Sequence, residues 1–336
     1  MDPDSVREVG RVPHGGSDDP DLLDFSANTN PRTPEGTESV YADALDSARS
    51  YPDDDYPEFR TAAADFAGCN PEEVVPTPGG LAALRLAFAT GVSPGDAVAI
   101  PYPSFGEYAR EVRLQGGVPE FVPHDELLDV DPKNFAAAVV CNPNNPTGDA
   151  YDSGALREFA DRCRASDTLL VVDEAFLGFT DRSSMAGTEG VAVARSLTKL
   201  FGLPGLRAGF AVGAGTVGDD LATVRRAWSL GTPSAKVGAY CLRQREFVAE
   251  TRERVRRERS RMADALADEF EVRSSEAPFL LLDTGERDPA EVVERARRAG
   301  VAIRDATTFR SLDSHVRVAV RAPDENDRLL EVLAGV

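Results

Sequence analysis

The sequence contains very little lysine: of its 37 basic residues only Lys133, Lys199 and Lys236 are lysines. It has only four cysteines and three histidines, without the short spacings of disulfide frameworks or metal sites, so we expect free thiols and no metal centre. No apolar run approaches the roughly 20 residues that span a bilayer. The start, Met1–Asp4, lacks the pattern of a signal peptide. These absences predict a cytoplasmic protein without membrane contact.

Acidic residues outnumber basic ones by 57 to 37, which gives a formal net charge of −20 at pH 7. Such a surface repels phosphate backbones and makes nucleic acids poor candidates for partners. Abundant aspartate with scarce lysine indicates a halophilic protein, in which salt screens the self-repulsion of the chain. The segment 252–259 is rich in arginine, but each arginine has acidic neighbours, so we interpret it as a solvated helix face.

The chain has 336 residues, a length that predicts two domains. Between about residues 41 and 233, short apolar runs alternate with helical patterns, which predicts an α/β domain with a mostly parallel sheet sandwiched by helices. The expected strands are Ala97–Ile100, Pro119–Val122, Ala137–Cys141, Thr168–Val172 and Ala208–Val212. The expected helices are Leu81–Ala89, Phe105–Leu114, Ser153–Arg164 and Asp219–Leu230.

The two ends of the chain have a different texture. Residues 1–40 are rich in Pro, Gly, Asp and Asn, which indicates an extended N-terminal arm that contributes to the small domain and the active site. Residues 234–336 start with one long helical pattern over 235–270 and continue as short strands and helices. We therefore expect a large α/β domain over 41–233 and a smaller α+β C-terminal domain over 234–336.

Polar residues gather where several predicted strands end, and the carboxyl ends of strands are where open α/β sheets bind ligands. Gly79 and Gly80 begin a helix, whose free N–H groups and dipole can receive a phosphate. Ser196 adds a hydroxyl group, and Arg207 adds a bidentate partner for phosphate. These four residues predict a phosphate site.

Three more side chains of this set have a different chemistry. Asp173 ends a hydrophobic strand, where it could hold a protonated pyridine nitrogen, and Asn145 lies in a rigid turn that would aim its amide at a ring substituent. Lys199 could form a Schiff base. A phosphate, a pyridinium and an aldehyde are the three recognisable groups of pyridoxal 5′-phosphate (PLP), so the combined set predicts a PLP site.

In this order, the motifs resemble those of the fold-type-I PLP-dependent enzymes, the aspartate aminotransferase superfamily, over essentially the whole chain. The resemblance implies the fold-type-I PLP-dependent transferase fold, with a mostly parallel, seven-stranded-type sheet. It also implies that Lys199 is the Schiff-base lysine and proton carrier, that Asp173 pairs with the pyridine nitrogen, and that Asn145 contacts the ring 3-oxygen. The other cofactor ligands it implies are Phe105, stacked on the ring, Phe176, and the phosphate ligands Gly80, Leu81, Ser196 and Arg207.

The same resemblance implies a homodimer with shared active sites, because Tyr51 matches a tyrosine that reaches the cofactor phosphate of the neighbouring subunit. Arg317 matches the arginine that binds the substrate carboxylate. Since the candidate substrates carry a phosphate, we also expect cations at its site, first Arg304 and then His14. Asn30 of the arm is the remaining predicted substrate ligand.

Two subfamilies fit, threonine-phosphate decarboxylase and histidinol-phosphate aminotransferase. Three details favour the decarboxylase: the arm motifs His14–Gly16 and Leu23–Pro31, Phe176 where most aminotransferases have tyrosine, and Arg321 where aminotransferases tend to have glycine. The favoured reaction converts L-threonine O-3-phosphate to 1-amino-2-propanol O-2-phosphate in cobalamin biosynthesis. Histidinol-phosphate aminotransferase or another class I/II aminotransferase is the alternative.

Readings outside this family are weaker. Gly213–Gly218 matches the GxGxxG fingerprint of dinucleotide-binding proteins, but the acidic residue expected about 20 positions later, at the end of a second strand, is missing. A PLP-sensing transcription regulator would need a DNA-binding module, for which no segment of the chain has room.

Overall fold

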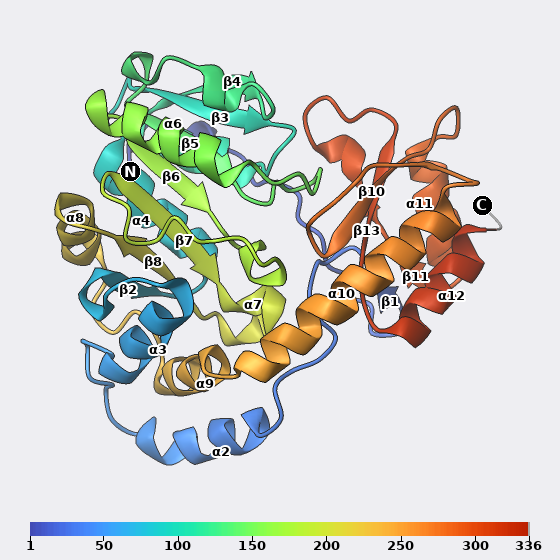
Figure 1. Cartoon of the computed structure of the whole chain (residues 1–336), viewed down its shortest axis with the longest axis horizontal. Helices are drawn as coiled ribbons and strands as arrows, with labels where there is room; N and C mark the ends of the chain where they lie inside the picture. The colour runs from blue at the N-terminus through green and yellow to red at the C-terminus, as the bar shows by residue number, and fades with distance from the viewer. Residues whose placement is uncertain (335–336) are drawn as a thin grey trace.

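The structure, a computed structural model, describes residues 1–334, which form two domains connected by a long helix (Figure 1). The large domain is built on a seven-stranded sheet, which confirms the expected α/β architecture. Five of the strands are parallel, and β8 runs antiparallel to both of its neighbours. In order across the sheet, the strands are β2 (Val74–Thr77), β8 (Gly209–Gly213), β7 (Val191–Ser196), β6 (Leu169–Asp173), β5 (Ala137–Cys141), β3 (Ala97–Tyr102) and β4 (Val118–Pro123).

Helices cover both faces of this sheet, and the strand residues alternate between them. In β5, Val139 packs into the apolar cluster of α4, α5 and α8, whereas Val140 packs into the cluster that includes α3, α6, α7 and α9. Because successive side chains point to opposite faces, a strand covered on both sides is apolar throughout. The helices are α3 (Pro57–Ala67), α4 (Gly80–Gly91), α5 (Glu107–Leu114), α6 (Ser153–Ala165), α7 (Leu197–Leu200), α8 (Thr216–Val224) and α9 (Thr232–Leu242).

The small domain consists of an antiparallel sheet in the order β12-β13-β10-β9, packed with α11 and α12. The N-terminal arm joins this domain, because β1 (Leu23–Asp24) pairs in parallel with β11 (Val301–Ala302). The other elements are β9 (Glu271–Val272), β10 (Phe279–Asp283), β12 (Arg304–Asp305), β13 (His315–Ala319), α11 (Pro289–Arg298) and α12 (Pro323–Leu333).

The prediction of a single long helix over residues 235–270 is wrong, because two helices, α9 and α10 (Arg245–Leu266), occupy this range. The helical path breaks at Gln244, whose ψ is 69°. Gly238 allows α9 to lie against α3, since a Cβ there would come within 2.7 Å of the Phe59 ring. α10 instead crosses to the small domain, where Arg261 pairs with Asp327 of α12. The domain boundary at residue 234 stays a prediction.

Two further differences concern shorter segments. The helix expected over Asp219–Leu230 ends at Val224, and the chain then turns so that Trp228 adopts a positive φ of 51°. β2 and β7 were not among the expected strands. Helix α2 (Thr37–Ser47) lies outside α9, and the short helix α1 (Ser5–Glu8) lies near α5.

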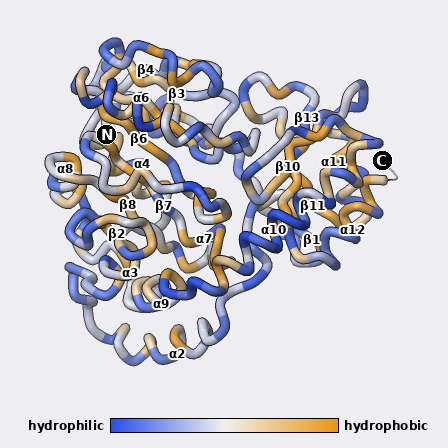
Figure 2. The backbone as a smooth tube through the Cα atoms, viewed as in Figure 1, coloured by the Kyte–Doolittle hydropathy of each residue, from blue (hydrophilic) through white to orange (hydrophobic). Residues whose placement is uncertain are grey.

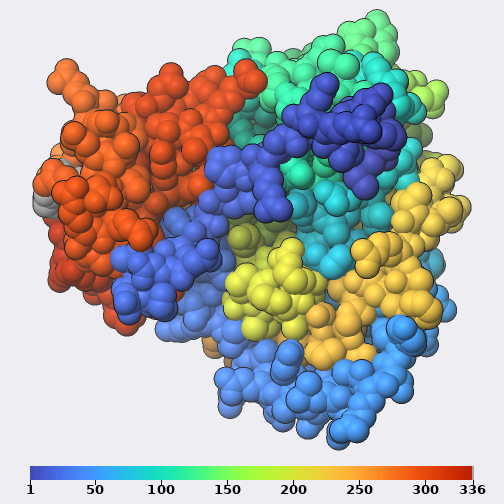
Figure 3. Space-filling view, turned by 180° about the vertical axis from the view of Figure 1, so that it is seen from behind, coloured from blue at the N-terminus to red at the C-terminus, as the bar shows by residue number. Residues whose placement is uncertain are grey.

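Apolar residues are concentrated in the central strands, whereas α10 is largely hydrophilic (Figure 2). Seen from behind, the N-terminal arm runs over the surface between the two domains (Figure 3). It is tied to α5 by hydrogen bonds from the Asp2 N–H to the Leu114 carbonyl and from Arg110 Nε to the Gly10 carbonyl. Across residues 1–334, no helix combines the length and apolar character that crossing a membrane requires.

Candidate active site

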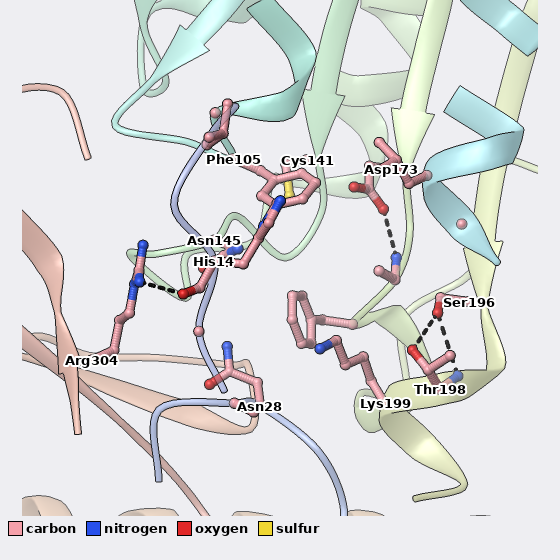
Figure 4. A pocket seen from close by; sticks show the side chains of 18 of the residues that line it. His14, Asn28, Phe105, Cys141, Asn145, Asp173, Ser196, Thr198, Lys199 and Arg304 are labelled. Atoms are coloured by element: carbon pink, nitrogen blue, oxygen red, sulfur yellow. Dashed lines mark hydrogen bonds between the residues drawn. The ribbon is translucent and has the colours of Figure 1, made fainter. Parts of the chain in front are cut away.

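A cavity of about 410 Å³ lies at the sheet edge where the parallel strands end, and both domains and the arm contribute to its walls (Figure 4). All predicted site residues except Tyr51 and Asn30 line it. They are His14, Gly80, Leu81, Phe105, Asn145, Asp173, Phe176, Ser196, Lys199, Arg207, Arg304 and Arg317. The structure therefore brings together residues from both ends of the chain, from His14 of the arm to Arg317 of the small domain.

The predicted phosphate ligands converge at the start of α4. The N–H groups of Gly80 and Leu81 belong to the first helical turn, where backbone donors have no intrahelical acceptor. Because β8 runs antiparallel, its start lies at this edge, and Arg207 lies two residues before it. Gly79 has a φ of +94°, and a Cβ there would lie 2.6 Å from a terminal nitrogen of Arg207. Only glycine permits this close approach of the guanidinium to the helix start.

Ser196 completes this group of donors. It caps α7, and its Oγ accepts a hydrogen bond from the Thr198 N–H at 3.3 Å. The hydroxyl groups of Ser196 and Thr198 are 2.7 Å apart. Backbone N–H groups, hydroxyls and a guanidinium are the donors that a phosphate needs.

Asp173 ends β6 and is buried beside the cavity. The Tyr108 hydroxyl donates to Asp173 Oδ2 at 2.7 Å, and the Ala175 N–H donates to Oδ1 at 2.9 Å. Burial raises the pKa of Asp173 above its usual value, and these hydrogen bonds and the nearby charge of Lys199 offset that rise only in part. The carboxylate is thus held in one orientation and can accept a cationic N–H from the cavity.

Lys199 lies in the short helix α7, and its amine reaches the cavity. Burial, together with the positive charges of Arg317 and Arg207, lowers the pKa of Lys199 to about 8. With this lowered pKa, a larger fraction of the amine is neutral near pH 7 than in an ordinary lysine, and the neutral amine is the nucleophile.

Arg317, on β13, brings the small domain to the cavity. Its guanidinium donates one hydrogen bond to Asn145 Oδ1 and another, of 3.0 Å, to the Ser26 carbonyl. Its Nε is buried and has no hydrogen-bond partner among residues 1–334. Burial, followed by the charge of Arg304, lowers the pKa of Arg317 to about 9. An anionic ligand would relieve both the desolvation and the repulsion between the arginines.

Aromatic rings form the apolar part of the wall. Phe105 makes an edge-to-face contact with Tyr108, with ring centroids 5.5 Å apart. Phe176 packs edge-to-face on Phe279 of the small domain at 5.2 Å. At position 176, a phenylalanine leaves the cavity without the hydroxyl that a tyrosine would supply.

His14 and Arg304 lie on the arm side of the cavity. Arg304 donates to the carbonyls of His14 and Pro13 at 2.7 and 3.0 Å and to the Thr308 hydroxyl at 2.9 Å. His14 Nε2 lies 3.0 Å from Glu107 Oε1. The structure thus places both residues predicted to bind the substrate phosphate at the cavity, and Arg304 also forms hydrogen bonds with the arm.

Asn30 does not line the cavity, which argues against its predicted role as a substrate ligand. Its N–H donates to the Lys199 carbonyl and its Nδ2 to the Leu200 carbonyl, while its Oδ1 accepts from Arg254 at 2.7 Å. Asn30 therefore connects α7 to α10 and acts on the position of Lys199. Its hydrogen-bonding groups are already used by the protein, so none is left for a substrate.

Tyr51 also lies outside the cavity of its own chain. Its side chain is 78% exposed and stacks on Trp228, which is 49% exposed, with ring centroids 4.5 Å apart. Within one chain this position supplies nothing to the site, so its predicted role from a partner subunit stays a prediction.

Sequence reasoning missed Tyr108, Asn28 and Thr198. Tyr108 follows Phe105 by three residues, one helical turn, but only the fold shows that it meets Asp173. Asn28 lines the cavity and is 4% exposed, and its Oδ1 has no partner among residues 1–334. It belongs to the same arm motif as Asn30, but alternation along an extended segment places residues i and i+2 on the same side, so the sequence pattern does not separate the two.

The GxGxxG segment is a tight turn from β8 into α8. A Cβ at Gly218 would lie 2.2 Å from the Gly213 carbonyl oxygen, so the glycine serves close packing of helix on strand. None of its residues lines the cavity. Within residues 1–334 no group of three or more His, Cys, Asp or Glu side chains is arranged to hold a metal ion.

The lowered pKa of Lys199 can be measured by competitive acetylation of the cofactor-free protein, with labelled lysines quantified by mass spectrometry. Lys133 is the internal reference, because pairing with Asp131 raises its pKa. Only the neutral amine reacts, so a lowered pKa shifts acetylation to lower pH. We expect a midpoint near pH 8 for Lys199. A Lys199 midpoint equal to or above that of Lys133 would contradict the electrostatic account.

Comparison with known proteins gives a consistent result. Residues 20–333 match the family model described as aminotransferase class I and II. A histidinol-phosphate aminotransferase of Archaeoglobus fulgidus is 31% identical over 94% of this chain and 99% of its own length, and the threonine-phosphate decarboxylase of Salmonella typhimurium is 30% identical over 99% and 95%. The crystal structure of the histidinol-phosphate aminotransferase from Clostridium acetobutylicum has the same fold, with a TM-score of 0.84, 22% identity and coverage of 94% and 98%. The chain belongs to the aminotransferase class I and II family of PLP-dependent enzymes.

Proposed function

We propose that this protein decarboxylates L-threonine O-3-phosphate to 1-amino-2-propanol O-2-phosphate, a step of cobalamin biosynthesis. The observation that carries the proposal is the set of cations on one side of the cavity, namely Arg317 and Arg304 of the small domain and His14 of the arm. Threonine phosphate carries a carboxylate and a phosphate at the same time. Two anionic groups suit two separate arginines, each of which can bind an anion in a bidentate manner.

The cavity residues fit PLP. The start of α4, Ser196 and Arg207 provide the donors for its phosphate, and the glycine at position 79 lets the Arg207 guanidinium approach the helix start. Asp173 is a buried acceptor for a protonated ring nitrogen, and Lys199 is the amine for the aldehyde. When bound, PLP supplies an electron sink for a bond broken at the substrate α-carbon.

Each residue then has a defined task in this proposal. Tyr108 keeps Asp173 oriented and favours its ionised form, so that a negative charge faces the ring nitrogen. Arg317 orients the substrate through its carboxylate, and Arg304 with His14 holds the phosphate. Lys199, whose pKa is lowered to about 8, is the group that moves a proton at the α-carbon.

Histidinol-phosphate aminotransferase is the second candidate, because the relative from Archaeoglobus fulgidus carries that name. Histidinol phosphate has a phosphate but no carboxylate, so it offers one anionic group where threonine phosphate offers two. Phe176 also favours the decarboxylase, because the resemblance places it where most aminotransferases have a tyrosine.

The direct test offers purified holoenzyme two substrates. We expect carbon dioxide release and formation of 1-amino-2-propanol O-2-phosphate from L-threonine O-3-phosphate, without a need for 2-oxoglutarate. The same preparation is assayed with histidinol phosphate and 2-oxoglutarate, with glutamate formation as the readout. Turnover of the second pair alone would reverse the assignment.

The role of Arg304 can be tested with Arg304→Ala. Loss of a charged partner of the phosphate should raise the KM for threonine phosphate by about 10- to 100-fold, the range for charged hydrogen bonds. The dissociation constant of PLP should change little, since the arginine lies away from the α4 start. Arg310→Ala is the matched control, because Arg310 packs on the Phe121 ring and does not line the cavity. An unchanged KM in Arg304→Ala would contradict the assignment.

The proposal includes a homodimer in which Tyr51 reaches the cofactor phosphate of the partner. Exposure of Tyr51 and Trp228 as a stacked aromatic pair supports it, because such apolar surface is typical of interfaces.

A subunit-mixing experiment tests the shared site. Tyr51→Ala and Lys199→Ala homodimers should each have low activity, but in a mixed dimer one site would combine Lys199 with an intact Tyr51. Random mixing after dissociation should then restore about a quarter of the wild-type activity, since half of the dimers are mixed and each has one intact site. Activity no higher than the average of the two parents would rule out sharing.

A further inference from the structure

We propose that Glu107 is the positioning residue that makes the arm histidine part of the substrate-phosphate site. This inference rests on the proposed function, because it assigns a task to His14 in binding the phosphorylated substrate. Glu107 itself does not line the cavity. It acts through the side chain of His14.

Glu107 is the first residue of α5, and its side chain is only 5% exposed. Its Oε1 lies 3.0 Å from His14 Nε2, and its Oε2 accepts from Arg110 at 3.2 Å. Behind it, Glu111 is fully buried and forms a two-point contact with Arg85 at 2.8 and 2.6 Å. The carboxylate is therefore rigidly supported on the side away from the arm.

This network is balanced in charge without the histidine. Glu107 and Glu111 carry two negative charges, and Arg85 and Arg110 carry two positive ones, with Arg110 contacting both carboxylates. Any proton that His14 gains is thus a net positive charge at the cavity wall. One oxygen of Glu107 contacts the half-exposed His14 ring. An ion pair that only stabilised the fold would need Arg110 alone, so this contact indicates a role for the histidine.

The contact fixes what the imidazole can do. Its Nε2 is engaged by Glu107, and Nδ1 has no hydrogen-bond partner among residues 1–334. Carboxylate and phosphate oxygens both accept hydrogen bonds, so a ring that bridges Glu107 and a phosphate carries a proton on each nitrogen. Through Glu107, His14 becomes a hydrogen-bonding group with a defined orientation instead of a mobile loop side chain.

The backbone of the arm is fixed from the other domain. Arg304 of the small domain holds the carbonyls of Pro13 and His14, as Figure 4 shows for His14. A Cβ at Gly106 would lie 2.7 Å from Val12, and one at Gly15 would lie 2.3 Å from the Ser26 carbonyl oxygen. The arm segment 12–15 is therefore held by both domains. Glu107 of the large domain contacts the His14 side chain, and Arg304 of the small domain binds the main chain.

The test is a double-mutant cycle on the holoenzyme with Glu107→Gln, His14→Ala and the combined variant. Each single variant should raise the KM for threonine phosphate about tenfold, the effect of one charged hydrogen bond, while kcat changes less than twofold. The combined variant should resemble His14→Ala alone, because Glu107 acts only through the ring. Glu120→Gln, an exposed residue on β4, is the control and should leave KM unchanged.

Several results would overturn the proposal. One is a wild-type KM in Glu107→Gln, and another is a KM in the combined variant that equals the product of the two single effects. A third is a loss of kcat as large as the rise in KM, which would indicate a merely structural residue. If Glu107→Gln does not fold, Gly15→Val provides a second route, since its Cβ displaces the arm without altering α5. It should raise KM by the same factor, and a wild-type KM in this variant would also contradict the proposal.

Competitive inhibition by inorganic phosphate separates this inference from the proposed function. If the wild-type enzyme does not decarboxylate threonine phosphate, the proposed function fails, and the same cycle is then read from the inhibition constant of phosphate. Loss of phosphate inhibition in both single variants would still support Glu107. Unchanged inhibition in both would refute it whichever substrate the enzyme uses.

Discussion

The central constraint in this structure is an excess of positive charge around a largely buried cavity. Among residues 1–334, its lining contains Lys199, Arg207, Arg304 and Arg317 but only one carboxylate, that of Asp173. Burial of like charges is costly, and it is reflected in the lowered pKa values of Lys199 and Arg317. Such a site is stabilised by anionic ligands, which explains why a phosphorylated cofactor fits it and why we propose an anionic substrate.

The fold places these cationic side chains on separate elements and points all of them into the same cavity. Parallel strands of the large domain end at the same edge and place Asp173 and Ser196 there, whereas the antiparallel β8 brings Arg207 to this edge from its start. Arg317 and Arg304 come from the small-domain sheet. Because the arm pairs with β11 and also contacts α5, it links the two domains on the side of the cavity where the substrate is proposed to bind.

Much of the site could be predicted because each motif adjoins a strand end or a helix start, where the local sequence already fixes the backbone. The predicted substrate ligand Asn30 lies outside the cavity for the opposite reason, since the partners of its amide lie on α7 and α10, far away in sequence. The break between α9 and α10 has no proline or glycine to mark it. It follows from two helices packing on different domains, which no local pattern reports.

The sequence by itself determined the alternation of strands and helices, the order of the chemically active residues and the resemblance to one enzyme family, because these depend on residue type and spacing along the chain. The tertiary structure alone decided which polar side chains meet. Tyr108 supports Asp173, Asn30 holds α7, and Glu107 reaches His14 across 93 positions. Hydrogen bonds between distant segments depend on how helices pack on the sheet, and packing is a property of the whole fold.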